Sequence, residues 1–237
     1  YRKALALDPT QALHTGNFAG FMTDVRGDHD EAERLYRKAL ALDPTQALHT
    51  GNFANFMKNV RGDHDEAERL YRKALALDPK DANQTCNFAA YLLSQGRLDE
   101  TAAMLEKAKG LFNRQKHQGT AEIALHEAIL ARVTKKDDTN ALEELRNILS
   151  DGFARCPWDF TNVLAYAQEH DSAEDHTLYC AFAEAVLDEK KVAAALALLD
   201  KRSATPATTV KPKRKKPTAK KPTAKKPTAK KPTAKKP

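Results

Sequence analysis

Residues 36–70 read YRKALALDPTQALHTGNFANFMKNVRGDHDEAERL, and this stretch decides the fold because it is one copy of an internal repeat. Residues 1–35 carry the same sequence with three substitutions, Gly20/Asn55, Thr23/Lys58 and Asp24/Asn59. Residues 71–105 restart with YRKALALDP and then diverge. The copies are 35 residues apart. A fixed period of this size is typical of proteins that stack one small structural unit.

Each copy has the pattern of two helices. Residues 11–25 carry apolar side chains on one face of a helix, ending at the turn residue Gly27. Asp28 or Asp30 can cap a second helix over residues 31–42, because a carboxylate there meets free backbone N–H groups. Residues 1–7 read as the second half of such a helix. One pair cannot bury its apolar face alone, so neighbouring pairs must stack into an all-α solenoid.

Small, aromatic and turn residues recur at fixed offsets within the copies. The first copy holds Ala19, Gly27, Ala32, Tyr36, Ala39 and Pro44, and the second holds Ala54, Gly62, Ala67, Tyr71, Ala74 and Pro79. This pattern resembles the tetratricopeptide repeat (TPR) family. The third copy departs from it at Thr101, Leu105 and Asn113, and the first two copies exceed the usual length of about 34 by one residue near Val25 and Val60. The resemblance implies an all-α, TPR-type helical hairpin solenoid.

Three regions are expected along the chain. Residues 1–113 would hold a fragmentary first unit followed by about three TPR units. Residues 114–200 keep helical patterns, for example over 120–133 and 172–187, and would form a degenerate repeat and a helical C-terminal cap. Residues 201–237 carry 15 Lys or Arg, no acid and 7 prolines, so we expect a disordered Lys/Pro-rich tail.

The net charge of +7 hides a division between the body and the tail. Residues 1–200 carry 24 Lys or Arg against 32 Asp or Glu, whereas the tail repeats the unit KKPTA. The tail resembles the Lys/Pro/Ala-rich tails of linker-histone-like proteins. Cations without acids can displace counterions from nucleic acid, and such binding is non-specific and salt-dependent. The expected contacts are Lys215, Lys216, Lys220, Lys221, Lys225, Lys226, Lys230 and Lys231.

The resemblance to the TPR family also implies a binding groove on the first helices of the pairs. Asn17, Asn52 and Asn87 occupy one repeat position there, and an amide can both donate to and accept from a peptide backbone. The alternative is that each Asn bonds a neighbouring helix. Further groove candidates are His14, His49, Asn55 and Lys58, although the two histidines can equally be near-surface helix residues. The residues next to these three asparagines are Gly16, Gly51 and Cys86. Because none of them is a lysine, a groove that binds the C-terminal carboxylate of a peptide is disfavoured.

Catalytic and metal sites are not expected from the sequence. The chain has no phosphate loop, HExxH or GxSxG motif. Cys86, Cys156 and Cys180 are far apart and form no zinc pattern. The acidic turns at 27–31 and 62–66 are typical helix starts, and the mixed cluster from Glu169 to His176 lacks the spacing of a zinc site. We therefore expect neither an enzyme nor a cofactor.

The first function hypothesis is a non-catalytic scaffold that binds an extended peptide or a helix of an unidentified protein in the groove. The alternative is a nucleic-acid-associated protein whose tail binds phosphates while the repeats recruit partners. Self-association through exposed repeat ends is a third possibility. No stretch is apolar enough to span a membrane, and an odd number of cysteines suits a reducing compartment. We expect a cytoplasmic protein, with nucleoid or nuclear association through the tail.

Overall fold

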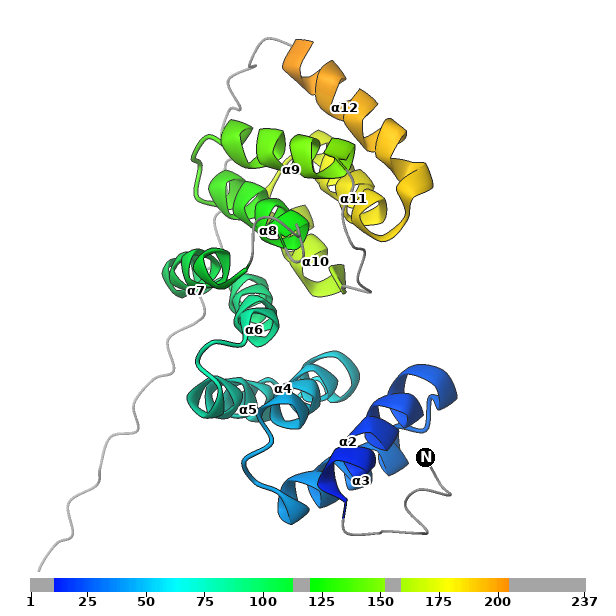
Figure 1. The fold of residues 1–237 in the computed structure, drawn as a ribbon. Helices are drawn as coiled ribbons and strands as arrows, with labels where there is room; N and C mark the ends of the chain where they lie inside the picture. Colours follow the sequence, from blue (N-terminus) through cyan, green and yellow to red (C-terminus); the bar gives the residue numbers. More distant parts are fainter. Residues whose placement is uncertain (1–10, 113–119, 152–158, 205–237) are drawn as a thin grey trace, which may run out of the picture. The chain divides into compact units, whose positions relative to one another are not determined.

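The repeats fold as pairs of adjacent helices, as Figure 1 shows. The computed structural model describes residues 11–112, 120–151 and 159–204. The first three pairs are α2 (Ala12–Phe21) with α3 (His29–Leu42), α4 (Ala47–Phe56) with α5 (His64–Leu77), and α6 (Ala82–Ser94) with α7 (Leu98–Leu111). The described residues contain no strand. The expectation of an all-α hairpin solenoid is therefore confirmed for them.

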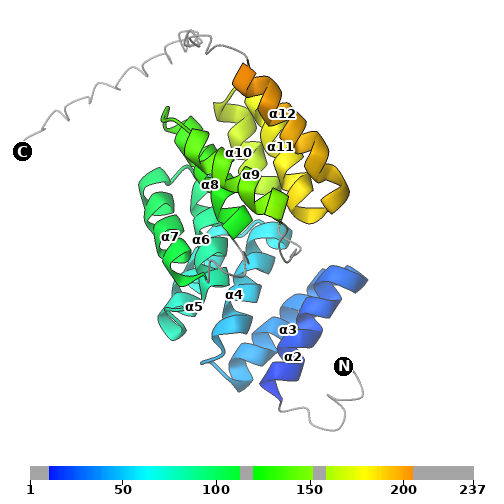
Figure 2. The same ribbon diagram turned by 45° about the horizontal axis from the view of Figure 1, so that its top comes forward.

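The helices that follow α7 lie side by side in Figure 2. They are α8 (Thr120–Val133), α9 (Thr139–Asp151), α10 (Thr161–His170), α11 (Ala173–Leu187) and α12 (Val192–Ala204), the last preceded by the 3₁₀ turn η4 (Glu189–Lys191). α8 pairs with α9, and α11 pairs with α12. α10 packs against α6 and α8 as well as against α11. It therefore brings a late part of the chain back onto the first helices of earlier pairs.

Glycine and aspartate set the turns inside the pairs. Gly27, Gly62 and Gly96 have φ of 63°, 66° and 70°, a left-handed conformation that side chains with a Cβ rarely adopt. Directly after the first two glycines, a carboxylate caps the next helix: Asp28 accepts from the Glu31 N–H at 3.2 Å, and Asp63 accepts from the Glu66 N–H at 3.0 Å. Of the two candidates for the first cap, Asp28 is the one used.

The extra residue of the first two copies is absorbed by π-helical turns. The π-helical turns η1 (Met22–Arg26) and η2 (Met57–Arg61) end the first helices of the first two pairs. From Gly62 to Gly96 the chain takes 34 residues, one fewer than from Gly27 to Gly62, and α6 ends without such a turn. A π-turn accommodates one inserted residue without breaking the helix. The inserted residue consequently changes the direction in which the side chains of η1 and η2 point, compared with the equivalent side chains of α6.

Small residues and stacked rings hold the pairs together. The repeat alanines, Ala19, Ala32, Ala39, Ala54, Ala67, Ala74, Ala89 and Ala108, are at most 1% exposed. Between pairs, the ring of Tyr36 stacks on Phe53 at 5.3 Å, and 35 residues later Tyr71 meets Phe88 at 5.5 Å. Contacts that recur at the repeat period show that the same interface is used twice, as a solenoid requires.

Some expectations fall on residues outside the described ranges. They are the helix over 1–7, the departure at Asn113, the segment around Cys156, and the tail from residue 205 onward with its lysines. Residues 201–204, which we expected to belong to the disordered tail, are instead the last residues of α12, where Arg202 pairs with Asp138. Within the described ranges, no helix combines the length and apolar character needed to cross a membrane.

Candidate functional site

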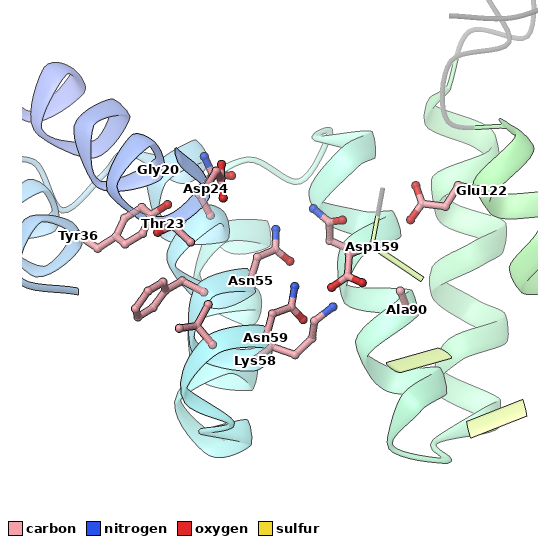
Figure 3. A pocket seen from close by; sticks show the side chains of 14 residues that line it. Gly20, Thr23, Asp24, Tyr36, Asn55, Lys58, Asn59, Ala90, Glu122 and Asp159 are labelled. Atoms are coloured by element: carbon pink, nitrogen blue, oxygen red, sulfur yellow. The ribbon is translucent and has the colours of Figure 1, made fainter. Parts of the chain in front are cut away.

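The first helices of successive pairs line a pocket of about 470 Å³, called here the polar pocket. Figure 3 shows its side chains converging from several helices. The polar lining consists of Thr23 and Asp24 of η1, Tyr36 of α3, Asn52 and Asn55 of α4, Lys58 and Asn59 of η2, Asn87 of α6, Glu122 of α8, and Asp159 ahead of α10. The described lining residues include no serine, cysteine or histidine. Amides and charges thus dominate the surface.

Two of the three asparagines at the shared repeat position line the polar pocket. Asn52 and Asn87 line it, whereas Asn17 is exposed and does not. Within the described part of the chain, neither the Asn52 nor the Asn87 amide has a hydrogen-bond partner. Asn55 differs, because its side-chain oxygen accepts a hydrogen bond from the Tyr71 hydroxyl. Burial raises the pKa of that hydroxyl, so it remains a donor.

The π-turn η2 places Lys58 inside the polar pocket. Lys58 is only 8% exposed, and its end points toward Asp159 in Figure 3. Burial lowers the pKa of Lys58, and the carboxyl groups of Asp159 and Glu122 oppose this shift. The equivalent residue of the first copy, Thr23, donates instead to the backbone oxygen of Ala19 at 3.1 Å. The substitution that distinguishes the two copies therefore creates the one pocket lysine among the described residues.

The expectation that His49 faces a groove is wrong. Its side chain is fully buried, and a Cβ built on Gly16 would lie 2.4 Å from the His49 ring. Because Gly16 has no side chain, the His49 imidazole can pack against the backbone of α2 at the contact between α2 and α4. Gln84 packs against Gly51 at the next contact in the same way. His14 is half-buried and does not line the polar pocket.

Residues at the start of α10 and directly ahead of it bound the pocket. Asn162 donates to the side-chain oxygen of Asn59 at 3.2 Å, and Asp159 lines the pocket itself. Ala90 and Leu93 of α6 share a core with Phe160. Part of the first-helix face near α6 is consequently covered by the chain's own later residues, and the sequence pattern of the repeats contains no sign of this.

A cluster of buried polar side chains from α6 and α8 lies next to the polar pocket. Cys86, Glu122 and His126 are all at most 3% exposed, and one potential ligand atom from each lies within 4.8 Å of the others. Burial raises the pKa of the Cys86 thiol, raises the pKa of Glu122 to about 8 and lowers the pKa of His126 to about 3. All three side chains are therefore mostly neutral at pH 7.

Sequence reasoning missed this cluster because Cys86 and Glu122 belong to different pairs. The spacing of Glu122 and His126, four residues apart on one helix face, is the signal that could have drawn attention to it. The Cys86 side chain, next to Asn87 in the sequence, is fully buried.

Two of the acidic residues between Glu169 and His176 have a structural role. Asp171 and Asp175 pair with Arg132 of α8, at 3.4 and 2.6 Å. Arg202 of α12 forms ion pairs with Asp175 and with Asp138. Asp138 also accepts a hydrogen bond from the Tyr179 hydroxyl at 3.1 Å. These charges join α8, α11 and α12.

Comparison with known families identifies the repeats. The family model described as tetratricopeptide repeat matches residues 22–48 and 55–85. These segments are tetratricopeptide repeats. No curated protein matches the chain in a sequence comparison.

Several solved structures resemble most of the chain. PilW, described as a widely conserved type IV pilus biogenesis factor, has a TM-score of 0.52 at 17% identity, with 85% of this chain and 82% of that chain covered. PilF of Pseudomonas aeruginosa has a TM-score of 0.51 at 20% identity, with 82% and 92% covered. YrrB, described as a TPR protein with an unusual peptide-binding site, has a TM-score of 0.49 at 20% identity, with 84% and 89% covered. At these identities, PilW and PilF show a shared fold.

Proposed function

We propose that this TPR chain is a non-catalytic scaffold that binds an extended peptide of a partner protein in the polar pocket. The tetratricopeptide repeats and the fold support the general role in protein interaction. The observation that carries the finer proposal is a pair of amides, Asn52 and Asn87, which have no hydrogen-bond partner among the described residues and lie one repeat apart in a single pocket.

The chemistry of these amides suits a peptide backbone. A side-chain amide can donate to a backbone C=O and accept from a backbone N–H at once. Tyr71 holds the oxygen of Asn55, which leaves its NH₂ group available as a further donor. Lys58 adds an ammonium group in the same space. Because backbone groups are common to all peptides, this set would recognise an extended conformation more than a particular sequence.

The test compares peptide binding by matched asparagine variants. Peptides selected from a displayed random library against the full chain would be measured by fluorescence anisotropy. Each Asn→Ala change removes hydrogen bonds worth about 1 kcal/mol, so the double variant Asn52→Ala/Asn87→Ala should bind about 10- to 100-fold more weakly.

Asn17→Ala is the control, since Asn17 holds the same repeat position outside the pocket. It should leave peptide affinity unchanged, and all variants should keep the thermal stability of the parent. Peptides that bind the double variant and the parent equally would refute the pocket as the binding site.

The basic tail supports a second candidate function. Beyond α12, residues 205–237 carry 13 Lys or Arg and no acid, which favours non-specific attraction to nucleic-acid phosphates, with a dissociation constant of the order of 10⁻⁴ to 10⁻⁶ M. In this alternative the repeats recruit partners while the tail holds the protein on nucleic acid.

A gel-shift titration of duplex DNA with charge variants tests the tail. Replacing the eight lysines from Lys215 to Lys231 by glutamine should abolish the shift, whereas replacing them by arginine should preserve it. The affinity of the parent should also fall steeply as salt is raised. Equal mobility with the glutamine variant and the parent would remove the nucleic-acid hypothesis.

A further inference from the structure

The buried cluster of Cys86, Glu122 and His126 contains polar atoms that the fold leaves unpaired. In the described part of the chain, both ring nitrogens of His126 and the Oε2 atom of Glu122 lack hydrogen-bond partners. Their side chains are only 1% and 3% exposed. Burying such groups without partners costs free energy, and buried polar groups are normally satisfied. A bound ligand would account for this arrangement.

The repeat register shows how the cluster arises. Cys86 of α6 occupies the position of Gly16 in α2 and Gly51 in α4. Each of those glycines accepts a side chain from the next pair, His49 or Gln84. Cys86 replaces the glycine with a thiol at the contact between α6 and α8. Glu122 and His126 are four residues apart on α8, a spacing that puts both on one face of the helix.

We propose that Cys86, Glu122 and His126 bind a zinc ion. Sulfur, imidazole nitrogen and carboxylate oxygen are the donors that zinc takes in proteins, at about 2.0 to 2.3 Å. A tetrahedral ion with such bonds needs neighbouring donor atoms about 3.5 Å apart. The three donor atoms already lie within 4.8 Å of one another, so small side-chain movements complete the site.

Charge balance favours a divalent ion in this place. A thiolate and a carboxylate together neutralise a dication, so the complete site would bury no net charge. Lys58 lines the neighbouring polar pocket and would repel an unneutralised ion, which makes the two anionic ligands necessary. Glu122 also lines this pocket, so the remaining coordination position would open toward solvent there. The inference does not depend on peptide binding.

Metal titration of the full chain tests the site. Chain freed of metal with a chelator would be titrated with Zn²⁺ by calorimetry, and with Co²⁺ as an optical probe of thiolate coordination. We expect one ion per chain, a near-ultraviolet charge-transfer band with Co²⁺, and a rise in melting temperature with Zn²⁺. Mutating residues that only support a metal ligand already costs 10- to 100-fold in affinity. Cys86→Ser, Glu122→Gln and His126→Asn, which remove ligands, should therefore each weaken binding by at least about 100-fold.

Cys180 and His176 on α11 provide a matched control. They also form a Cys–His pair, with Sγ and Nε2 3.5 Å apart, but they are partly exposed. Cys180→Ser and His176→Asn should keep the cobalt band and the zinc affinity, and so should Cys156→Ser. Circular dichroism would show that each variant remains folded. Absence of binding by the parent, or a band that survives Cys86→Ser, would overturn the proposal.

Discussion

Replacing Gly16 by alanine is expected to lower the free energy of unfolding by about 2 to 3 kcal/mol. A Cβ at this position would lie 2.4 Å from Cγ and Cδ2 of the His49 ring, far inside van der Waals contact. His49 is fully buried, so its ring cannot move into solvent to make room. The contact between α2 and α4 would have to open instead. Urea unfolding followed by circular dichroism measures the effect.

Gly20 provides the matched control on the same helix. A Cβ there would lie 3.6 Å from the Tyr36 hydroxyl oxygen, which is an ordinary contact. Gly20→Ala should therefore stabilise the chain by up to about 1 kcal/mol, because alanine favours a helix interior. In a His49→Ala background, the cost of Gly16→Ala should disappear. An equal cost of Gly16→Ala with and without the imidazole would contradict the packing explanation.

Replacing Arg132 by glutamine should lower the free energy of unfolding by about 3 kcal/mol. The Arg132 Nη2 atom lies 2.6 Å from Asp175 and 3.4 Å from Asp171, whose side chains are only 9% and 7% exposed. Removing the guanidinium leaves two carboxylates close together, with Arg202 still paired to Asp175. Breaking a buried ion pair is costly because the remaining charge stays out of water. Thermal and urea unfolding would both report the loss.

Arg146 on α9 is the control for this substitution. It pairs with Asp200 at 2.6 Å, but the Asp200 side chain is 66% exposed. Exposed pairs contribute little, so Arg146→Gln should change stability by less than about 1 kcal/mol. Arg132→Lys, which keeps the positive charge, should recover part of the loss. Similar effects of Arg132→Gln and Arg146→Gln would show that the buried pairing is not important for stability.

Much of the fold could be predicted from residue types at repeat positions. The glycine at 27, the carboxylate at 28 and the alanines at 32 and 39 each act through local rules of turns, caps and close helix packing. Such rules depend on neighbours a few residues away, which the sequence displays directly. The inserted residue near Val25 was visible too, although the π-turn that absorbs it was not.

The candidate site was less predictable, because its geometry depends on contacts between distant residues. His49 and Asn52 are three residues apart on one helix, yet one is buried against Gly16 and the other lines the polar pocket. Identical repeat positions can also differ in exposure, as Asn17 and Asn52 show. The arrival of Asp159 at the pocket depends on where α10 packs, which no repeat rule states.

The sequence by itself determined the helical hairpins and their stacking, because periodic apolar faces, helix caps and turn glycines act over short distances and recur every 35 residues. Only the tertiary structure decided which side chains share a space. It buried Lys58 beside two asparagines and brought Cys86 to Glu122 and His126 across a helix contact. The physical reason is that burial and electrostatic environment depend on the packing of separate helices, and a linear pattern specifies that packing only indirectly.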